Sequence, residues 1–145
     1  MTHAAERETD AAIEQACART VLQLFAGMDD FRYDDVTAAF TPEGVWNRAG
    51  KALAGHAMIR AAMEERSPER LVRHVITNQL VTVAGATHAE GRCYVTAYAG
   101  PKTNPTINAP WLVLTMTQRF ERRDGAWKIA EARIERDFVF NGQVE

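Results

Sequence analysis

The second half of the chain carries the pattern of four long β-strands separated by short turns. Segments rich in Val, Ile, Thr, Tyr and Phe follow one another at residues 71–84, 87–99, 111–122 and 126–138. Gly85-Ala86 and Arg123-Asp124-Gly125 are short enough to form hairpins, so neighbouring strands are expected to run antiparallel. The segment 100–110 holds three of the five prolines and is expected to be a loop at a pocket rim.

The first half of the chain carries the pattern of amphipathic helices. Apolar residues recur at intervals of three and four over residues 10–28, which predicts a helix with one buried stripe. Further helices are predicted over 34–40 and 56–66, with a brief strand at 45–47 between them. Helices followed by a long meander predict an α+β fold, a cone-shaped barrel in which a curved antiparallel sheet is covered by N-terminal helices around an apolar cavity.

Length and composition limit the classes of protein to consider. A chain of 145 residues with 46% hydrophobic residues is expected to form one domain over 1–145. A formal net charge of −2 with scattered basic residues argues against nucleic acid as a partner. No apolar stretch is long enough to span a bilayer and residues 1–8 are polar, so the expected location is the cytoplasm. Cys17 and Cys93 lack metal-ligand spacing and are expected to be buried thiols.

His74 is the first candidate for chemistry. Alternation along the first long strand places it on a face whose other members are Val72, Ile76, Asn78 and Leu80. A half-buried imidazole can take or give a proton near neutral pH, provided that a partner fixes its tautomer.

Asp29 is the candidate partner. It extends the buried stripe of the first helix by one turn beyond Phe25. The C-terminal end of a helix disfavours an anion by about 0.3–1 kcal/mol, so a carboxylate there needs a donor, which a facing histidine would supply. The pattern alone leaves two interpretations open: a His74–Asp29 dyad, or a satisfied core histidine beside a solvated helix end.

Other residues are candidates for lining a pocket. Trp46 lies on the brief strand, where it either faces the cavity or fills the core. Asn78 either binds a substrate oxygen or bonds to the neighbouring strand. The length of the hairpin loop determines which side chains of the next strand share the face of His74. A two-residue loop puts Cys93, Val95 and Ala97 on that face, whereas a longer loop puts Tyr94 and Tyr98 there.

Several motifs, in this order, resemble the SnoaL-like branch of the nuclear-transport-factor-two-like superfamily over nearly the whole chain. They are Met28-Asp29, the run from Phe40 to Trp46, Gly55, the run from Arg73 to Asn78, and the run from Glu121 to Ile129. The sequence is most similar to the group that contains scytalone dehydratase, bile-acid dehydratase and hexachlorocyclohexane dehydrochlorinase.

This resemblance implies a dyad of His74 as base and Asp29 as its orienting carboxylate, without a metal or organic cofactor. Tyr33 loosely resembles the position from which dehydratases of this group offer an acidic hydroxyl. Members of the group often carry an arginine where this chain has Ala132, and a strand bulge would be needed to bring Arg133 into that role. Without one, Arg133 is expected at the surface.

Three functions follow from these observations. The first is a cofactor-independent lyase, eliminating water, or an isomerase, acting on a small hydrophobic molecule such as a polyketide, steroid or terpenoid. The second is a binding protein of the same fold, and the third is the accessory small subunit of a ring-hydroxylating dioxygenase. The face opposite the pocket carries Val75, Val81 and Val83, which predicts a homodimer formed sheet to sheet, although resemblance also allows trimers.

Overall fold

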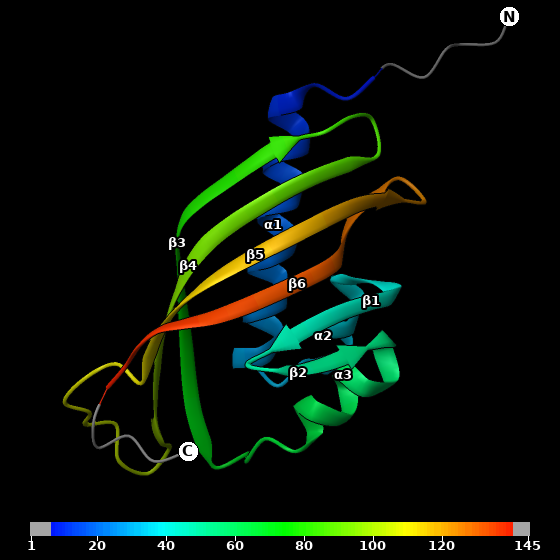
Figure 1. Cartoon of the computed structure of the whole chain (residues 1–145). Helices are drawn as coiled ribbons and strands as arrows, with labels where there is room; N and C mark the ends of the chain where they lie inside the picture. Colours follow the sequence, from blue (N-terminus) through cyan, green and yellow to red (C-terminus); the bar gives the residue numbers. More distant parts are fainter. Residues whose placement is uncertain (1–6, 141–145) are drawn as a thin grey trace, which may run out of the picture.

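The computed structural model describes residues 7–140, in which three helices lie against one face of a six-stranded sheet (Figure 1). The helices are α1 (Asp10–Asp29), α2 (Tyr33–Ala38) and α3 (Gly55–Glu64). The strands are β1 (Phe40–Arg48), β2 (Lys51–Ala54), β3 (Arg70–Val83), β4 (His88–Pro101), β5 (Leu112–Arg123) and β6 (Ala126–Val139). Their order across the sheet is β2-β1-β6-β5-β4-β3.

The four long strands form the antiparallel meander that the sequence predicts. Asp124 and Gly125 both have positive φ in the two-residue turn between β5 and β6, as the Asp-Gly pair favours. The prediction of a wholly antiparallel sheet is wrong at one seam, because β1 pairs with β6 in parallel. The sheet is therefore mixed, and it stays open, with β2 at one edge and β3 at the other.

The region around Pro42 differs most from the prediction. The helix predicted over 34–40 ends at Ala38, and the residues expected to terminate it begin β1 instead. The β1–β6 register shifts between Phe40 and Val45, which accommodates a proline that cannot donate to the ladder. The unpredicted β2 returns alongside β1 through a turn in which Ala49 and Gly50 both have positive φ.

A β-bulge in β3 sets the direction of its side chains. The β3–β4 register shifts between Thr77 and Leu80, and Asn78 there is exposed with φ 54°. His74 faces the helices, but beyond the bulge it is Val81 and Val83 that pack against the core, while Leu80 is exposed. The predicted face is therefore wrong after Ile76, as is the outward placement of Val81 and Val83.

The same bulge determines which side chains of β4 face the cavity. The loop between β3 and β4 is longer than two residues, since the N–H of Ala84 bonds to the carbonyl of His88. The bulge adds one residue to β3 and so compensates for the additional residue in the loop. His74 therefore pairs with Ala97. Cys93, Val95 and Ala97 are buried, whereas Tyr94 and Tyr98 lie on the outer face.

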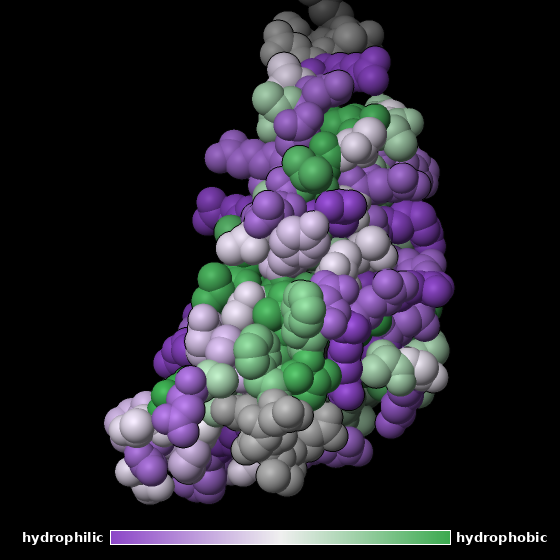
Figure 2. Space-filling view, turned by 60° about the vertical axis from the view of Figure 1, so that its left-hand side comes forward, coloured by the Kyte–Doolittle hydropathy of each residue, from purple (hydrophilic) through white to green (hydrophobic). Residues whose placement is uncertain are grey.

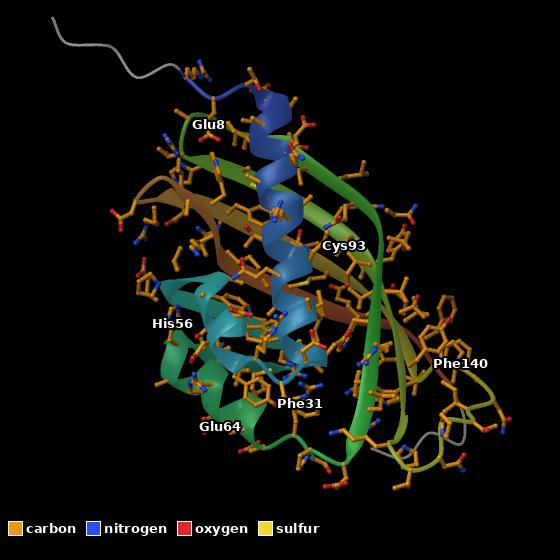
Figure 3. The ribbon with its side chains drawn as sticks, turned by 180° about the vertical axis from the view of Figure 1, so that it is seen from behind. Glu8, Phe31, His56, Glu64, Cys93 and Phe140 are labelled. Atoms are coloured by element: carbon orange, nitrogen blue, oxygen red, sulfur yellow. The ribbon has the colours of Figure 1, made fainter. Side chains whose placement is uncertain are left out.

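The long helix α1 crosses the concave face of the sheet (Figure 3). The side chain of Thr9 caps its start, and the buried residues of its stripe include Ile13, Cys17 and Leu24. Thr20 donates to the carbonyl of Trp127 at 2.8 Å, which ties α1 to β6. No helix among residues 7–140 has both the length and the apolar composition needed to cross a bilayer.

Candidate active site

His74 and Asp29 make two hydrogen bonds to each other. The ring nitrogen Nδ1 of His74 lies 2.6 Å from Oδ1 of Asp29, and the backbone N–H of His74 donates to Oδ2 at 3.0 Å. Both side chains are largely buried, with exposed fractions of 8% and 12%. A carboxylate only accepts hydrogen bonds, so Nδ1 carries the proton and Nε2 remains available as a base.

The end of α1 places Asp29 at this position. Phe31 adopts a left-handed conformation with φ 57°, and the N–H of Arg32 bonds to the carbonyl of Gly27 at 2.8 Å, which closes the helix in a Schellman motif. Arg66 donates to the carbonyl of Met28 at 2.7 Å. A guanidinium beside the helix end offsets the unfavourable placement of the Asp29 carboxylate there. Figure 3 shows Phe31 at this end of α1.

Gly27 makes the tight packing at this helix end possible. A Cβ at this position would lie 3.0 Å from the carbonyl oxygen of Arg32 and 3.1 Å from a methyl group of Val36. Gly27 therefore lets α2 pack directly against the last turn of α1.

A cavity of about 270 Å³ lies beside the His74 ring. The Phe25 ring, with its centroid 4.9 Å from that of His74, shares the cavity wall. Further apolar side chains on this wall are Met28, Leu53, Ala97, Leu112, Leu114 and Ile134. The cavity thus places an imidazole with a fixed tautomer against a mostly apolar space.

Trp46 and Arg48 of β1 also line the cavity. Trp46 is 1% exposed, and its Nε1 has no hydrogen-bond partner among the described residues. The Arg48 guanidinium lies over the Trp46 ring, 4.7 Å from the ring centroid. Burial lowers the pKa of Arg48, as do the neighbouring charges of Arg66 and Arg136.

Sequence reasoning missed Arg48, although a signal was present. Arg48 is two residues from Trp46, so in an extended strand both side chains lie on the same face. The predicted strand stopped at residue 47, one residue short of Arg48.

Four predicted pocket residues lie outside this cavity. Tyr33 lines a separate shallow depression with Phe31 and Arg60. Asn78 is exposed at the bulge, and Tyr94 lies on the outer sheet face, where Arg92 donates to its hydroxyl. Arg133 is 61% exposed and forms an ion pair with Glu131. The register of β6 against β5 shifts at Ile129, and beyond this bulge Ala132 rather than Arg133 faces inward. None of these four residues lines the His74 cavity.

The cysteines and the metal-ligating residue types form no second centre in the described part of the chain. Cys17 and Cys93 are both buried free thiols. Burial raises the pKa of Cys17 to about 12, with a smaller contribution from the charge of Glu8. Over residues 7–140, His, Cys, Asp and Glu side chains form no group of three that could hold a metal ion.

Several solved structures share the fold at low sequence identity. A proposed scytalone dehydratase from Novosphingobium aromaticivorans has a TM-score of 0.81 at 14% identity, with 94% of this chain and 91% of the other covered. A proposed aromatic ring hydroxylase from the same organism has a TM-score of 0.76 at 19% identity, covering 94% and 96%. A protein of unknown function with a cystatin-like fold from Nostoc punctiforme has a TM-score of 0.75 at 13% identity, covering 91% and 96%.

These likenesses establish the cystatin-like α+β architecture. No curated protein matches the sequence. The sequence itself matches the SnoaL-like domain over residues 6–133, which is most of its length. The chain therefore belongs to the SnoaL-like domain family.

Proposed function

We propose that the protein is a cofactor-independent lyase of the dehydratase type, or an isomerase, that acts on a small hydrophobic molecule. The observation that carries this proposal is the 2.6 Å contact between His74 Nδ1 and Asp29 Oδ1 beside a mostly apolar cavity. Membership of the SnoaL-like family and the fold shared with a proposed scytalone dehydratase support a function of this class.

In the proposed reaction His74 Nε2 removes a proton from a substrate carbon. The electron pair of the broken C–H bond becomes the new double bond, and a hydroxyl leaves from the adjacent carbon with its own bonding pair. The imidazolium then gives its proton to this hydroxide, which becomes water and leaves His74 neutral again. Asp29 stabilises the imidazolium that forms and keeps its ring oriented. For isomerisation, the same imidazolium returns the proton to a different carbon.

The size of the cavity favours small substrates within this class. Ligand pockets usually measure about 300–1,000 Å³, and the volume beside His74 is about 270 Å³. We therefore propose a substrate with one or two rings, of the polyketide or terpenoid kind, rather than one as large as a steroid.

The test is turnover of a panel of hydroxylated cyclic ketones, followed by mass spectrometry. Loss of water reports elimination, and deuterium uptake from D₂O without loss of water reports proton removal from carbon, the first step of isomerisation. Replacing His74 by Ala is expected to lower kcat by at least about 100-fold, the usual contribution of a general base. Replacing Asp29 by Asn is expected to lower kcat as well, since the imidazolium loses its counter-charge.

A second histidine provides the matched control. His88 is exposed in the β3–β4 hairpin, where its ring contacts the Thr87 hydroxyl, so His88→Ala is expected to keep the wild-type rate. Unchanged turnover in a folded His74→Ala variant would contradict the catalytic proposal. Panel compounds that bind and are released unaltered would instead favour a binding protein or an accessory subunit.

A further inference from the structure

The charged residues around the cavity are unevenly distributed. Arg48, Lys51 and Arg136 line the cavity as cations, and Glu65 lines it as an anion. Arg66 adds a further positive charge near Arg48, since its charge contributes to lowering the pKa of Arg48. The cavity wall therefore has an excess of positive charge, although the net formal charge of the whole chain is −2.

Arg48 has no counter-ion among the described residues. No side chain over residues 7–140 forms an ion pair or a hydrogen bond with its guanidinium, which instead makes a cation–π contact with the Trp46 ring. Several exposed arginines of the described chain do have carboxylate partners, as Arg60 has Asp34 and Arg119 has Glu131. A half-buried guanidinium keeps its charge at a cost unless an anion pairs with it.

The indole beside Arg48 also has an unused donor. Trp46 Nε1 is buried without an acceptor, and an unsatisfied buried donor costs about 1–3 kcal/mol. The apolar wall formed by Phe25, Met28 and Leu114 lies in the same cavity. One cavity thus combines apolar side chains with a cation that has no ion-pair partner over residues 7–140.

We infer that the cavity takes a small apolar acid, whose carboxylate pairs with Arg48 while its hydrocarbon body lies on the apolar wall beside His74. A guanidinium presents parallel N–H donors that match a carboxylate, and such a charge-assisted pair fixes orientation as well as affinity. The inference rests on the proposed function for its biological meaning, because it names the substrate class of the same site. Arg48 is a specificity-determining residue in this arrangement.

A pair of probes that differ only in charge tests the inference. Naphthoate and its neutral amide, naphthamide, have the same ring system and nearly the same shape. Isothermal titration calorimetry is expected to show that the wild-type protein binds naphthoate at least about tenfold more tightly than naphthamide. Arg48→Gln is expected to abolish this preference with little effect on naphthamide, and Arg48→Lys to keep a smaller preference.

Arg133 supplies the control, since it is an exposed arginine on the outer face of the sheet. Arg133→Gln is expected to keep the full preference for naphthoate. Binding and turnover are measured separately, so loss of turnover in the His74 variant does not bear on the Arg48 result. Equal affinity for the two probes in the wild type, absence of naphthoate binding at millimolar concentration, or a preference retained by a folded Arg48→Gln variant would overturn the inference.

Discussion

At the scale of single residues, the carboxylate of Asp29 determines what the imidazole of His74 can do. One oxygen accepts from the backbone N–H of His74 and the other contacts Nδ1 of its ring, so the ring has two fixed points. The Phe25 ring packs against the imidazole as well. This arrangement leaves Nε2 as the nitrogen that can act on a ligand.

The first prediction concerns the tautomer of His74. In the neutral state its ring is expected to carry the proton on Nδ1, because the facing Asp29 carboxylate can only accept. Nitrogen-15 NMR distinguishes a protonated from an unprotonated imidazole nitrogen and therefore identifies the tautomer of His74. Asp29→Asn is expected to increase the population of the other tautomer, while a wild-type Nε2–H signal for His74 would contradict the proposed role of Nε2.

The second prediction concerns stability at alkaline pH. Burial raises the pKa of Cys17 to about 12, whereas a thiol in the unfolded chain has a pKa of about 8.5. Above about pH 8.5 the unfolded state loses this proton before the folded state does, so the contribution of Cys17 to stability falls as pH rises toward 12. The fall is at most about 1.4 kcal/mol per pH unit.

Urea unfolding of wild type and Cys17→Ala between neutral pH and about pH 10.5 measures this effect. The variant is expected to be less stable at neutral pH, because it leaves a small void in the core. The difference in free energy of unfolding should narrow as pH rises, since the variant lacks the ionising thiol. Parallel curves for the two proteins would show that Cys17 does not make this contribution.

At the scale of elements, the bulge in β3 holds His74 in register with β4. Asn78 occupies the left-handed conformation that the bulge needs, and asparagine tolerates this conformation better than most residues. Without the bulge, the register set by the hairpin would bring Tyr98 rather than Ala97 opposite His74. The small Ala97 leaves space for the cavity that a tyrosine would fill.

A third prediction follows for Asn78. Asn78→Val is expected to lower the free energy of unfolding by about 1–2 kcal/mol, because a β-branched residue is strained at positive φ. Asn78→Gly is expected to be near neutral, since glycine adopts this conformation freely. Urea unfolding measures both, with the exposed neighbour Thr77→Val as control. Equal stability of the Val and Gly variants would contradict the role assigned to the bulge.

The elements that the sequence predicts well are those with a strong repeating pattern. Period-two alternation and the Asp124-Gly125 turn locate the four long strands to within two residues, and helical spacing does the same for α1. The strand β2 has no such signal, since Lys51–Ala54 is rich in alanine, and its formation depends on β1 beside it. Pro42 was wrongly expected to end a helix, because it lies in an irregular part of β1, where a missing N–H is tolerated.

The residues of the candidate site were likewise predicted where the sequence pattern is regular and missed where it is irregular. The sequence pattern singled out His74 and Asp29 because each is a polar residue on an apolar stripe, and the family resemblance supplied their roles as a dyad. Asn78 was misplaced because a bulge changes the direction of every later side chain in β3. No residue type predicts a bulge unambiguously. Arg48 was missed because its strand extends further than its sequence pattern indicates.

At the scale of the whole molecule, the outer face of the sheet exposes apolar side chains. Val75 and Leu80 of β3 are 45% and 61% exposed, and Tyr94 and Tyr98 of β4 are each 37% exposed. Figure 2 shows apolar surface gathered between polar regions on the side of the molecule that carries β3. Exposed apolar surface of this kind is typical of protein–protein contacts.

The fourth prediction is a homodimer that buries this face. Light scattering at micromolar concentration is expected to give about twice the 16.2 kDa mass of one chain. Val75→Glu, which places a charge in the contact, is expected to give monomers, whereas Leu22→Glu, at an exposed apolar position on α1, is expected to leave the dimer intact. A monomeric or trimeric wild-type protein would contradict the prediction.

The parallel pairing of β1 with β6 joins distant parts of the chain. Trp46 lies beside Ala132 and Arg48 beside Ile134, so the cavity wall combines residues from near the start and the end of the sequence. During synthesis, the β3–β5 hairpins can form before β6 has left the ribosome, but this wall cannot. Ligand binding should therefore arise late in folding, after the slow closure of the long loop between β1 and β6.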